Sequence, residues 1–365
     1  MPYPTKKLGE VLEYEQPTNY LVSSTDYKDE YPIPVLTAGK SFILGNTNER
    51  SGIFPKEKLP VIIFDDFTTA IKFVDFPFKV KSSAMKILHA KKDKADIRFL
   101  FYKMLTIKFQ HEQHKRYWIS ECANLKIPLP PLEIQKQIVE RLDKIVEAQK
   151  LNNDLIQKSD ELFQSLLHKE LNPAGKDWEV KKVKDVAVVK NGGTPSTKNQ
   201  KYWNGKILWL TPKELSGFED IEISDTERKI SDEGLKHSSA TVLPAGAVLL
   251  TSRAPIGYIA IAGVPMATNQ GFKNFVCDSK LLNNEFLYFF LRLKTKYLQS
   301  LGRGATFTEI SKTAVEKVEI PLPPLEIQKQ IVAKLSAVQE YKTQLLAQKS
   351  KLKELFNSVL SKSFK

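Results

Sequence analysis

A long internal duplication limits the folds open to this chain more than any other feature of its sequence. The segment IPLPPLEIQKQIV occupies Ile127–Val139 and recurs 193 residues further along the chain, at Ile320–Val332. The same offset aligns ELFQSLLHK at Glu161–Lys169 with ELFNSVLSK at Glu354–Lys362, and no gap is needed. Two copies are too few for a solenoid. We therefore expect a molecule with pseudo-two-fold symmetry.

Each copy of the repeat predicts one long helix. It begins at a proline pair, Pro130–Pro131 or Pro323–Pro324, because proline is favourable at the first helical position, where its missing N–H would be unpaired. A glutamate follows in the first turn, where the helix dipole favours a carboxylate. No further Pro or Gly occurs before residue 170 or 362, so each helix can run for about 38 residues, or roughly 57 Å.

Apolar residues recur along both predicted helices at alternating spacings of four and three, which is typical of a coiled coil. Polar residues interrupt these stripes and can fix their register; they are Gln149, Asn152 and Ser159 in the first helix and Lys342 and Lys349 in the second. We expect the two stripes to pack against each other. The alternative is that each helix packs on its own domain. The residues that we assign to helix pairing are Ile138, Leu142, Ile145, Ile156 and Phe163, and Ile331, Leu335, Val338, Leu345, Leu352 and Phe356.

The repeated helices divide the chain into a first domain (1–128), a central helix region (129–171), a second domain (172–321) and a C-terminal helix region (322–365). Both domains open on a similar Lys-Lys segment and close with an Ile-Ser pair, Ile119–Ser120 or Ile310–Ser311, but their interiors differ almost completely. Short strand patterns, such as VIIFDDF and AGAVLLTSRAPIGYIAIAG, alternate with some helical periodicity. We predict two α+β domains of one fold that read different targets.

Composition and charge indicate which class of partner and which cellular compartment suit this chain. Hydrophobic residues make up 42% and charged residues 27% of the chain, as in an ordinary globular protein, while the net charge of +13 favours a polyanionic partner. Cys122 and Cys277 form no disulfide or zinc-ligand pattern, and we expect two buried or inert thiols in a reducing cytosol. No signal peptide is expected, because the N-terminal segment MPYPTKKLGEVLEYEQP has no apolar core of that type. No membrane span is expected, because no apolar stretch reaches about 18–20 residues. We predict a cytoplasmic protein.

The motifs of both domains resemble those of the specificity (S) subunits of type I restriction-modification systems, over essentially the whole chain. The PLPPLEIQKQIV boxes are similar to the starts of that family's conserved regions. In the first domain, Pro34–Gly45 and Val61–Leu88 resemble one subtype of target-recognition domain. In the second, three segments resemble another subtype; they are Gly192–Leu215, Leu249–Gly263 and Ala267–Cys277.

The resemblance implies a non-catalytic, DNA-binding subunit. Its fold class would be α+β, with two similar target-recognition domains separated by two long helices that pair as an antiparallel coiled coil. Each domain would read one half of a bipartite site in double-stranded DNA, and the helix pair would set the unread spacer. Two methyltransferase (M) subunits would dock on the helices, and restriction (R) subunits would join them. The chain would bind no cofactor itself, because S-adenosylmethionine, ATP and Mg²⁺ would bind the partner subunits.

The second domain holds side chains of the types that read DNA bases. Arg253 can donate two hydrogen bonds to guanine or hold a phosphate, and Asn269 and Gln270 can pair with adenine. Each has a structural alternative: the arginine can brace its turn, and asparagine stabilises turns. Lys273 is expected to contact a phosphate or to be solvated. Weaker candidates for DNA contact are Thr211, Lys213 and Arg303, the last in a Gly-Arg-Gly turn.

In the first domain we expect Thr68 and Thr69 to be exposed at the end of a strand, and phosphate contacts from Lys40 and Lys72. The adjacent Asp65 and Asp66 suggest a metal, although a structural turn is favoured.

His111 and His114 have a spacing that can bind metal on a helix, but no third ligand cluster accompanies them. We therefore predict no metal site.

Two competing functions can be weighed from the sequence. A stand-alone enzyme, such as a nuclease or a fused methyltransferase, is disfavoured by missing motifs. The chain has no P-loop, which argues against an ATPase, and Asn172-Pro173 is followed by Ala174 rather than by the Pro-aromatic pair of adenine methyltransferases. Glu179-Val180-Lys181 resembles a nuclease's acidic-x-Lys element but has no convincing paired acid. A scaffold for a DNA-modifying complex that does not read sequence is the other alternative. Two dissimilar interiors in one repeated frame disfavour it.

Overall fold

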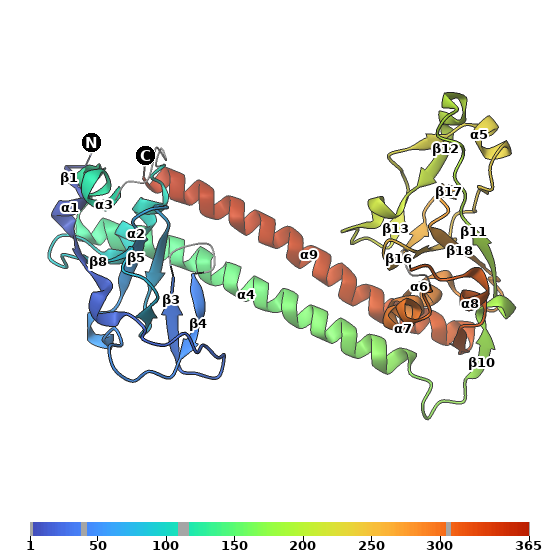
Figure 1. Cartoon of the computed structure of the whole chain (residues 1–365), viewed down its shortest axis with the longest axis horizontal. Coiled ribbons are helices and arrows are strands. Elements are labelled where there is room, and N and C mark those ends of the chain that lie inside the picture. Colours follow the sequence, from blue (N-terminus) through green and yellow to red (C-terminus); the bar gives the residue numbers. More distant parts are fainter. Residues whose placement is uncertain (1–2, 38–41, 109–116, 304–307, 365) are drawn as a thin grey trace. The chain divides into compact units, whose positions relative to one another are not determined.

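A computed structural model describes residues 3–37, 42–108, 117–303 and 308–364. Lys40, His111 and His114 lie outside these residues, so their roles stay predictions. The chain divides into two compact units, Met1–Asp154 with Ala347–Lys365, and Leu155–Leu346. Two long helices, α4 (Leu132–Leu171) and α9 (Leu325–Ser363), contribute residues to both units (Figure 1).

The first unit contains two sheets. The larger is antiparallel, in the order β2-β8-β5-β6, and the smaller has the order β4-β3-β7. The strands are β1 (Thr5–Lys7), β2 (Leu12–Glu15), β3 (Ile33–Leu36), β4 (Ile43–Thr47), β5 (Val61–Asp65), β6 (Ile71–Val74), β7 (Lys79–Val80), β8 (Met85–Ala90) and β9 (Lys126–Pro128). The short helices are α1 (Leu8–Val11), α2 (Ile97–Leu105) and α3 (Tyr117–Ser120).

The second unit repeats this plan. Its larger sheet has the order β11-β18-β15-β16-β13, and its smaller sheet has the order β14-β12-β17. The strands are β10 (Glu179–Lys182), β11 (Ala187–Asn191), β12 (Trp203–Leu210), β13 (Glu222–Ile223), β14 (Lys229–Ile230), β15 (Val248–Ser252), β16 (Ile256–Ala262), β17 (Ala267–Thr268), β18 (Phe272–Cys277) and β19 (Glu319–Leu322). The short helices are α5 (Asp232–Lys236), α6 (Asn284–Leu293), α7 (Thr295–Ser300) and α8 (Lys312–Glu316).

Each unit has its own larger and smaller sheet, and the strand order of each sheet is equivalent in the two units. In chain order, the strands of each four-stranded core are placed first, fourth, second and third, and β13 is an addition to the second unit. Each smaller sheet places its three strands second, first and third, and the third joins in parallel. In both units the strand that opens the domain pairs with the strand before the long helix, β1 with β9 and β10 with β19. The prediction of two similar α+β domains is confirmed.

Alternation along the central strand explains how each sheet is covered. In β5, Ile62 and Phe64 face the core that contains α2, while Val61 and Ile63 face a second core on the other side. Because both faces are covered, all five residues of this strand are buried. The helix that follows the sheet, α2 or α6, supplies large apolar side chains such as Phe99 and Phe286.

The repeated boxes form the predicted helices, which contain 40 and 39 residues. Their glutamates lie in the first turn, as expected. The second proline of each pair lies one residue before the helix rather than at its first position. There its carbonyl accepts the first helical bond, from Gln135 N–H to Pro131 O at 3.1 Å and from Gln328 N–H to Pro324 O at 3.0 Å.

The fourth residue of each long helix is a fully buried glutamine that joins the helix to its domain. The Gln135 Oε1 atom accepts a hydrogen bond from the N–H of Asp96, the N-cap of α2, at 2.8 Å, and its Nε2 donates to the Pro130 carbonyl at 2.8 Å. Gln328 does the same for Asn283, the N-cap of α6. The repeated box therefore encodes a clamp between the long helix and the domain helix.

Within the second unit the long helices run antiparallel. Lys342 Nζ lies 2.7 Å from Asp160 Oδ1, and Lys334 Nζ lies 3.2 Å from Glu170 Oε2. Residue numbers rise along α4 as those of their partners fall along α9. Lys342, which interrupts the predicted stripe, is therefore matched by an acidic residue on the other helix.

Within the first unit the two helices also pack together. Gln149 Nε2 donates to the Leu352 carbonyl at 3.1 Å, and Leu142 and Leu360 share one apolar cluster. The polar Asn152 is 2% exposed in this part of α4, so the polar interruption of the stripe is buried. The predicted antiparallel pairing is confirmed, Gln149 and Asn152 lie within it, and Lys349 is exposed.

The helices also pack on the domains, so the two arrangements that we weighed coexist. Phe163 of α4 contacts Phe289 of α6 with ring centroids 6.1 Å apart. Phe356, the equivalent residue of α9, contacts Tyr102 of α2 at 6.1 Å. None of the eleven stripe residues is exposed. Those that are buried are Leu142, Phe163, Ile331, Leu335 and Leu345, and those that are half-buried are Ile138, Ile145, Ile156, Val338, Leu352 and Phe356.

The Ile-Ser pairs are not equivalent in the structure. Ile119–Ser120 lies inside α3, whereas Ser311 is the N-cap of α8. The residue that matches Ile310 is Tyr117, because their N–H groups bond the carbonyls of Ser252 and Asp66, at the ends of equivalent strands. In the part of the chain that the structure describes, no helix is both long and apolar enough to cross a membrane.

Candidate nucleic-acid interface

Several of the predicted DNA-contact residues of the second unit meet around Gly271. A Cβ atom at this glycine would lie 3.0 Å from Asn269 Oδ1, 3.2 Å from Pro212 Cγ and 3.5 Å from Arg253 Cγ. These residues come from three separate turns, which follow β12, β15 and β17. We call Thr211, Pro212, Arg253, Asn269, Gln270 and Gly271 the Gly271 cluster.

The turn after β17 is held by its own polar groups. Asn269 Oδ1 accepts the Gly271 N–H at 2.7 Å, and the Asn269 N–H donates to the Leu210 carbonyl at 2.9 Å. The side-chain oxygen of Asn269 therefore stabilises the turn, which is the structural role that was weighed against base reading. Gln270 is exposed and accepts a hydrogen bond from the Thr194 hydroxyl.

The turn after β12 is a capping box. The Thr211 hydroxyl donates to Glu214 Oε2 at 2.7 Å, and the same oxygen accepts the Thr211 N–H at 2.8 Å. Thr211 is half-buried, while Lys213 is exposed. Since its hydroxyl proton is engaged, Thr211 can offer DNA an acceptor more readily than a donor.

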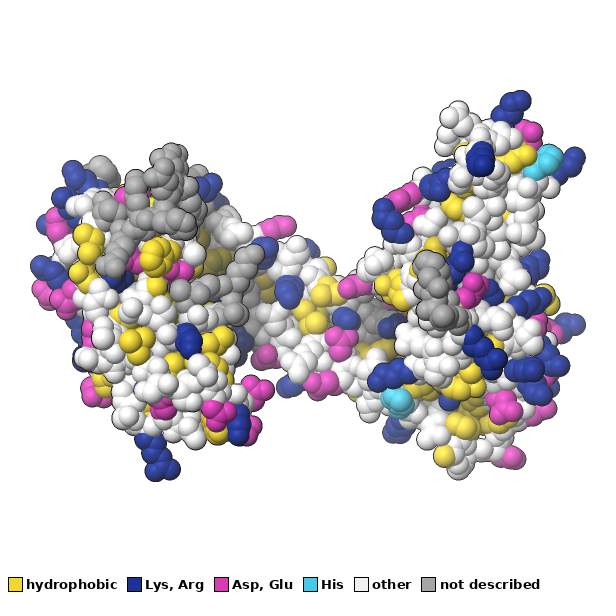
Figure 2. Space-filling view, viewed as in Figure 1, with side chains coloured by type: hydrophobic (Ala, Val, Ile, Leu, Met, Phe, Trp, Pro, Cys, Tyr) yellow, Lys and Arg dark blue, Asp and Glu magenta, His cyan; other side chains and the backbone are white. Residues whose placement is uncertain are grey.

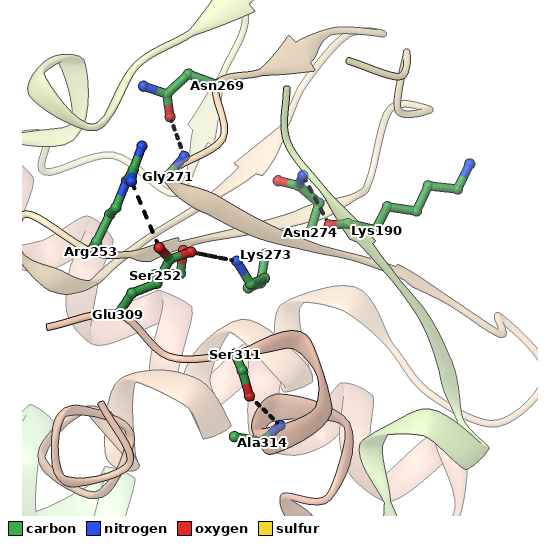
Figure 3. A network of polar contacts seen from close by, with 10 residues as sticks. All are labelled: Lys190, Ser252, Arg253, Asn269, Gly271, Lys273, Asn274, Glu309, Ser311 and Ala314. Atoms are coloured by element: carbon green, nitrogen blue, oxygen red, sulfur yellow. Dashed lines mark hydrogen bonds and ion pairs between the residues drawn. The ribbon is translucent and has the colours of Figure 1, made fainter. Parts of the chain in front are cut away.

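Arg253 belongs to an ionic network with Lys273 and Glu309 (Figure 3). The Glu309 Oε1 atom lies 3.0 Å from Lys273 Nζ, and its Oε2 atom lies 3.7 Å from Arg253 Nη1. Lys273 Nζ also donates to the Ser252 hydroxyl at 3.2 Å. The arginine side chain is 33% exposed and the lysine side chain 6% exposed.

This burial corrects the prediction for Lys273. Its strand, β18, is an inner strand of the larger sheet, between β11 and β15, and the Lys273 side chain is buried and donates to Glu309 and Ser252. A lysine in this position cannot lie on the surface as a solvated side chain or extend to a phosphate.

Arg303 is exposed beside this network. Its backbone exchanges two hydrogen bonds of 3.0 Å with Glu309. The predicted turn around Arg303 is therefore joined to the base of the network rather than being an isolated loop.

In the first unit, β5 ends in a tight turn. The Asp65 carboxylate accepts the Phe67 N–H at 3.0 Å and the Thr68 hydroxyl, and Thr69 takes a left-handed φ of 58°. Thr68 is exposed and Thr69 half-buried, and the Thr69 hydroxyl donates to the Thr68 carbonyl at 2.7 Å. The favoured interpretation of Asp65 as a structural turn residue is confirmed.

Lys72 is exposed on β6, with its Nζ 5.8 Å from the centroid of the Phe42 ring. Asp66 is buried, accepts the Trp118 N–H at 2.8 Å and lies 3.6 Å from Lys86 Nζ. Among the residues that the structure describes, no three His, Cys, Asp or Glu side chains are placed to hold a metal ion.

Lys86 and Lys273 occupy the same place in the two units. Lys86 of β8 lies opposite Phe64 of β5, and Lys273 of β18 lies opposite Leu250 of β15. Lys86 contacts Asp66, which directly follows β5. Lys273 contacts Ser252, the last residue of β15. The repeat therefore extends to a buried cation beneath the turn of each domain. Sequence reasoning missed it, because a lysine inside a sheet gives no local pattern.

On the face shown in Figure 2, Lys and Arg side chains are frequent over the second unit, with Asp and Glu between them.

The two cysteine thiols are shielded from solvent. Burial, with a further contribution from Glu121 and Asp66, raises the pKa of the Cys122 thiol to about 12. Burial also raises the pKa of the Cys277 thiol to about 12. Neither thiol is ionised near neutral pH, as expected of inert cysteines.

Comparison with known proteins identifies the family. The profile of the type I restriction modification DNA specificity domain matches residues 2–158 and again 175–354. The specificity subunit of the Escherichia coli type I restriction enzyme EcoR124I/EcoR124II is 36% identical over 344 residues, covering 89% of this chain and 84% of that protein. The MjaIX specificity subunit of Methanocaldococcus jannaschii is 43% identical over 192 residues, covering 52% of this chain and 43% of its own.

Solved structures agree on the fold. The HsdS subunit of Thermoanaerobacter tengcongensis has a TM-score of 0.53 at 21% identity, and the S subunit of M. genitalium has a TM-score of 0.64 at 14% identity. Each comparison covers 100% of this chain and 96% of the other. With two matched domains, a helix pair and relatives that share one name, the chain belongs to the family of type I restriction-modification specificity subunits.

Proposed function

We propose that this chain reads a bipartite site in double-stranded DNA, with one domain on each half. The observation that carries the proposal is the shared fold of the two units, in which equivalent turns present different side chains. The turn after β5 carries Thr68 and Thr69, and the turn after the equivalent strand of the second unit, β15, carries Arg253. One frame with two sets of side chains suits two different base sequences.

The side chains of the Gly271 cluster suit base-edge contacts. Arginine pairs with guanine, asparagine and glutamine pair with adenine, and lysine makes contacts to phosphate that carry no sequence information. In this proposal Arg253, Asn269 and Gln270 read DNA bases. Lys213 and Arg303 contact the sugar-phosphate backbone of the DNA. In the first unit, Thr68 and Thr69 read bases, and Lys72 and Lys40 contact phosphates.

The chain is a non-catalytic subunit, as specificity subunits of type I restriction systems are. We propose that two M subunits dock on the helix region and that R subunits complete the complex. S-adenosylmethionine, ATP and Mg²⁺ would then bind those partners, and this chain would need no cofactor of its own. The complex would act on DNA in the cytoplasm.

The helix pair is proposed to set the length of the unread spacer. Gln149–Leu155 is one heptad of α4, and Leu346–Leu352 is the heptad opposite it on α9. Deleting both heptads together should shorten the spacer and leave both half-sites unchanged. A change in the half-sites themselves would show that the helices do more than separate the domains.

The direct test of the function is selection of binding sites from random duplex DNA by the full chain, alone and with its M partner. The expected result is a motif of two short half-sites with a fixed spacer, and methylation only when the M subunit is present. Binding without any sequence preference would support the scaffold alternative. Methylation by the chain alone would contradict a non-catalytic role.

A further inference from the structure

Glu309 is an unexpected residue to find beside the Gly271 cluster. Its side chain is 37% exposed and lies 3.7 Å from Arg253, one of the residues proposed to read a base. A carboxylate close to DNA repels phosphates and lowers affinity unless it has a separate role. The contacts of Glu309 indicate what that role is.

The backbone of Glu309 is fixed on both sides. Glu309 and Arg303 exchange two backbone hydrogen bonds of 3.0 Å, and the next residue, Ile310, donates its N–H to the Ser252 carbonyl at 3.0 Å. Ser252 is the direct neighbour of Arg253 in the chain. The backbone position of Glu309 relative to Arg253 is therefore set by main-chain hydrogen bonds.

The side chain of Glu309 is fixed by Lys273. A lysine that is 6% exposed needs a nearby anion, since an unpaired buried charge is strongly unfavourable. Lys273 Nζ donates to Glu309 Oε1 at 3.0 Å and to the Ser252 hydroxyl oxygen at 3.2 Å, so the other carboxylate oxygen, Oε2, is the one directed toward Arg253 (Figure 3). The buried lysine thus orients the carboxylate from below, and the carboxylate faces the arginine.

The first unit provides an internal comparison. Its equivalent lysine, Lys86, is paired with Asp66 at 3.6 Å, and both side chains are 3% exposed. Asp66 also accepts the Trp118 N–H at 2.8 Å, so this pair lies wholly inside the domain. In the second unit the acid comes instead from the segment before α8, is only half-buried and has an arginine beside it. A buried lysine needs only an anion, so the exposure of Glu309 and its arginine partner call for a further role.

We propose that Glu309 is a positioning residue for DNA recognition: held by the buried Lys273, it orients the Arg253 guanidinium for one base pair of the second half-site. This inference rests on the proposed function. Lys273 acts through Glu309, and Glu309 acts through Arg253, which is the group that touches the base. The pair also holds the arginine in place before DNA arrives, which reduces the side-chain entropy lost on binding.

The test uses the full chain and duplexes that carry the site selected by the wild-type protein. Dissociation constants are measured for this duplex and for duplexes with single base-pair changes in each half. Arg253→Gln should lose about tenfold or more of the discrimination at one or two positions of one half-site, as expected for a lost arginine–guanine contact. Glu309→Asp keeps a negative charge for Lys273 but withdraws it from Arg253, and it should lose discrimination at the same positions.

A double variant separates positioning from folding. Glu309→Gln alone leaves Lys273 without its anion, so its melting temperature should fall. Adding Lys273→Met removes the buried charge, so the double variant should melt near the wild-type temperature while its discrimination at the Arg253 positions stays lost. Glu316→Gln is the matched control, because Glu316 pairs with Lys312 on α8 and should change neither property.

The outcomes are distinguishable. If the wild-type chain selects no sequence at all, the proposed function fails and this inference fails with it. If the wild-type chain selects a site but both Glu309→Asp and the double variant keep full discrimination at the Arg253 positions, only the positioning role is overturned. A uniform loss of affinity for both half-sites in a variant that melts normally would also overturn it.

Discussion

Gln135 and Gln328 occupy the same position of the two repeats, and each accepts a hydrogen bond of 2.8 Å from the N-cap residue of its domain helix. Each also donates to the carbonyl of the first proline of its box, Pro130 or Pro323. Gln328 has a further bond to the Leu281 carbonyl at 2.9 Å. This clamp explains why a glutamine that is fully buried stands in a helix whose other glutamines are mostly on its surface.

Replacing either glutamine with alanine should destabilise the unit that contains it. Each buried group left without its partner costs about 1–3 kcal/mol in the free energy of unfolding. Gln328→Ala should be the more damaging change, because it loses one bond more. Urea unfolding followed by tryptophan fluorescence can assign the effect, since Trp118 lies in the first unit and Trp178, Trp203 and Trp209 lie in the second. Gln157→Ala, an exposed control that loses only a contact with Glu161, should change the free energy by less than about 0.5 kcal/mol.

The equivalent phenylalanines of the repeat should differ in importance. Phe163 is 6% exposed and carries the Arg292 guanidinium 4.9 Å from its ring centroid, whereas Phe356 is half-buried. Phe163→Ala should therefore reduce the free energy of unfolding by about 3–5 kcal/mol, and Phe356→Ala by less. Leu162→Ala is a suitable control, because Leu162 is 50% exposed. Equal losses at the two phenylalanines would mean that burial does not decide their contributions.

Gly271→Ala should weaken DNA binding more than folding. The new Cβ would lie 3.0 Å from Asn269 Oδ1 and 3.2 Å from Pro212 Cγ, so these two side chains must shift by a few tenths of an ångström, and it would touch Arg253 Cγ at 3.5 Å. We expect roughly a tenfold weaker affinity for duplexes bearing the selected site, the value of one base contact, in a direct binding assay. The exposed Ser279→Ala in the same unit should bind as the wild type does. An unchanged affinity of Gly271→Ala would show that the Gly271 cluster does not touch DNA.

The stability of the first unit should depend on pH through Glu15. Burial raises the pKa of this carboxyl, but the Tyr20 hydroxyl at 2.6 Å, the charge of Lys58 and the His89 ring at 3.0 Å lower it more, so the net pKa lies below its ordinary value of 4.5. A carboxyl whose pKa is lower in the folded state stabilises the fold above the unfolded pKa and loses this contribution as the pH falls through the folded pKa.

Glu15→Gln tests this relationship. The variant should be less stable than the wild type at pH 7, by about 1–3 kcal/mol for hydrogen bonds to a charged group. The difference should shrink as the pH falls below about 5. It is measured from urea unfolding of both proteins across that range. A difference that stays constant from pH 7 to pH 3 would contradict the lowered pKa.

The long helices and the shared fold could be predicted, because both follow from local patterns. Heptad spacing and the absence of Pro or Gly define α4 and α9, and the ungapped repeat implies equal lengths. The clamp at Gln135 was not predicted, since a glutamine in a polar helix segment carries no sign of burial. The position of each proline differed by one residue, which lies within the ordinary variation of helix ends.

The site was predictable only in part. Arg253 and Asn269 were chosen for their chemistry, and the structure brings both to Gly271. The burial of Lys273 was missed because both faces of its sheet are covered, which no single strand reveals. Glu309 was missed because its partners lie 36 and 56 residues earlier in the chain, at positions 273 and 253, and only the fold brings them together.

The central claim is that each domain reads its own half of one DNA site. The most direct measurement selects binding sites from random duplex DNA with the wild-type chain and with two variants, Arg253→Gln in the second unit and Thr69→Ala with Lys72→Ala in the first. The account predicts a bipartite motif in which each variant alters one half, a different half for each, and leaves the other half and the spacer intact. A motif in which either variant alters both halves, or a single undivided motif, would contradict it.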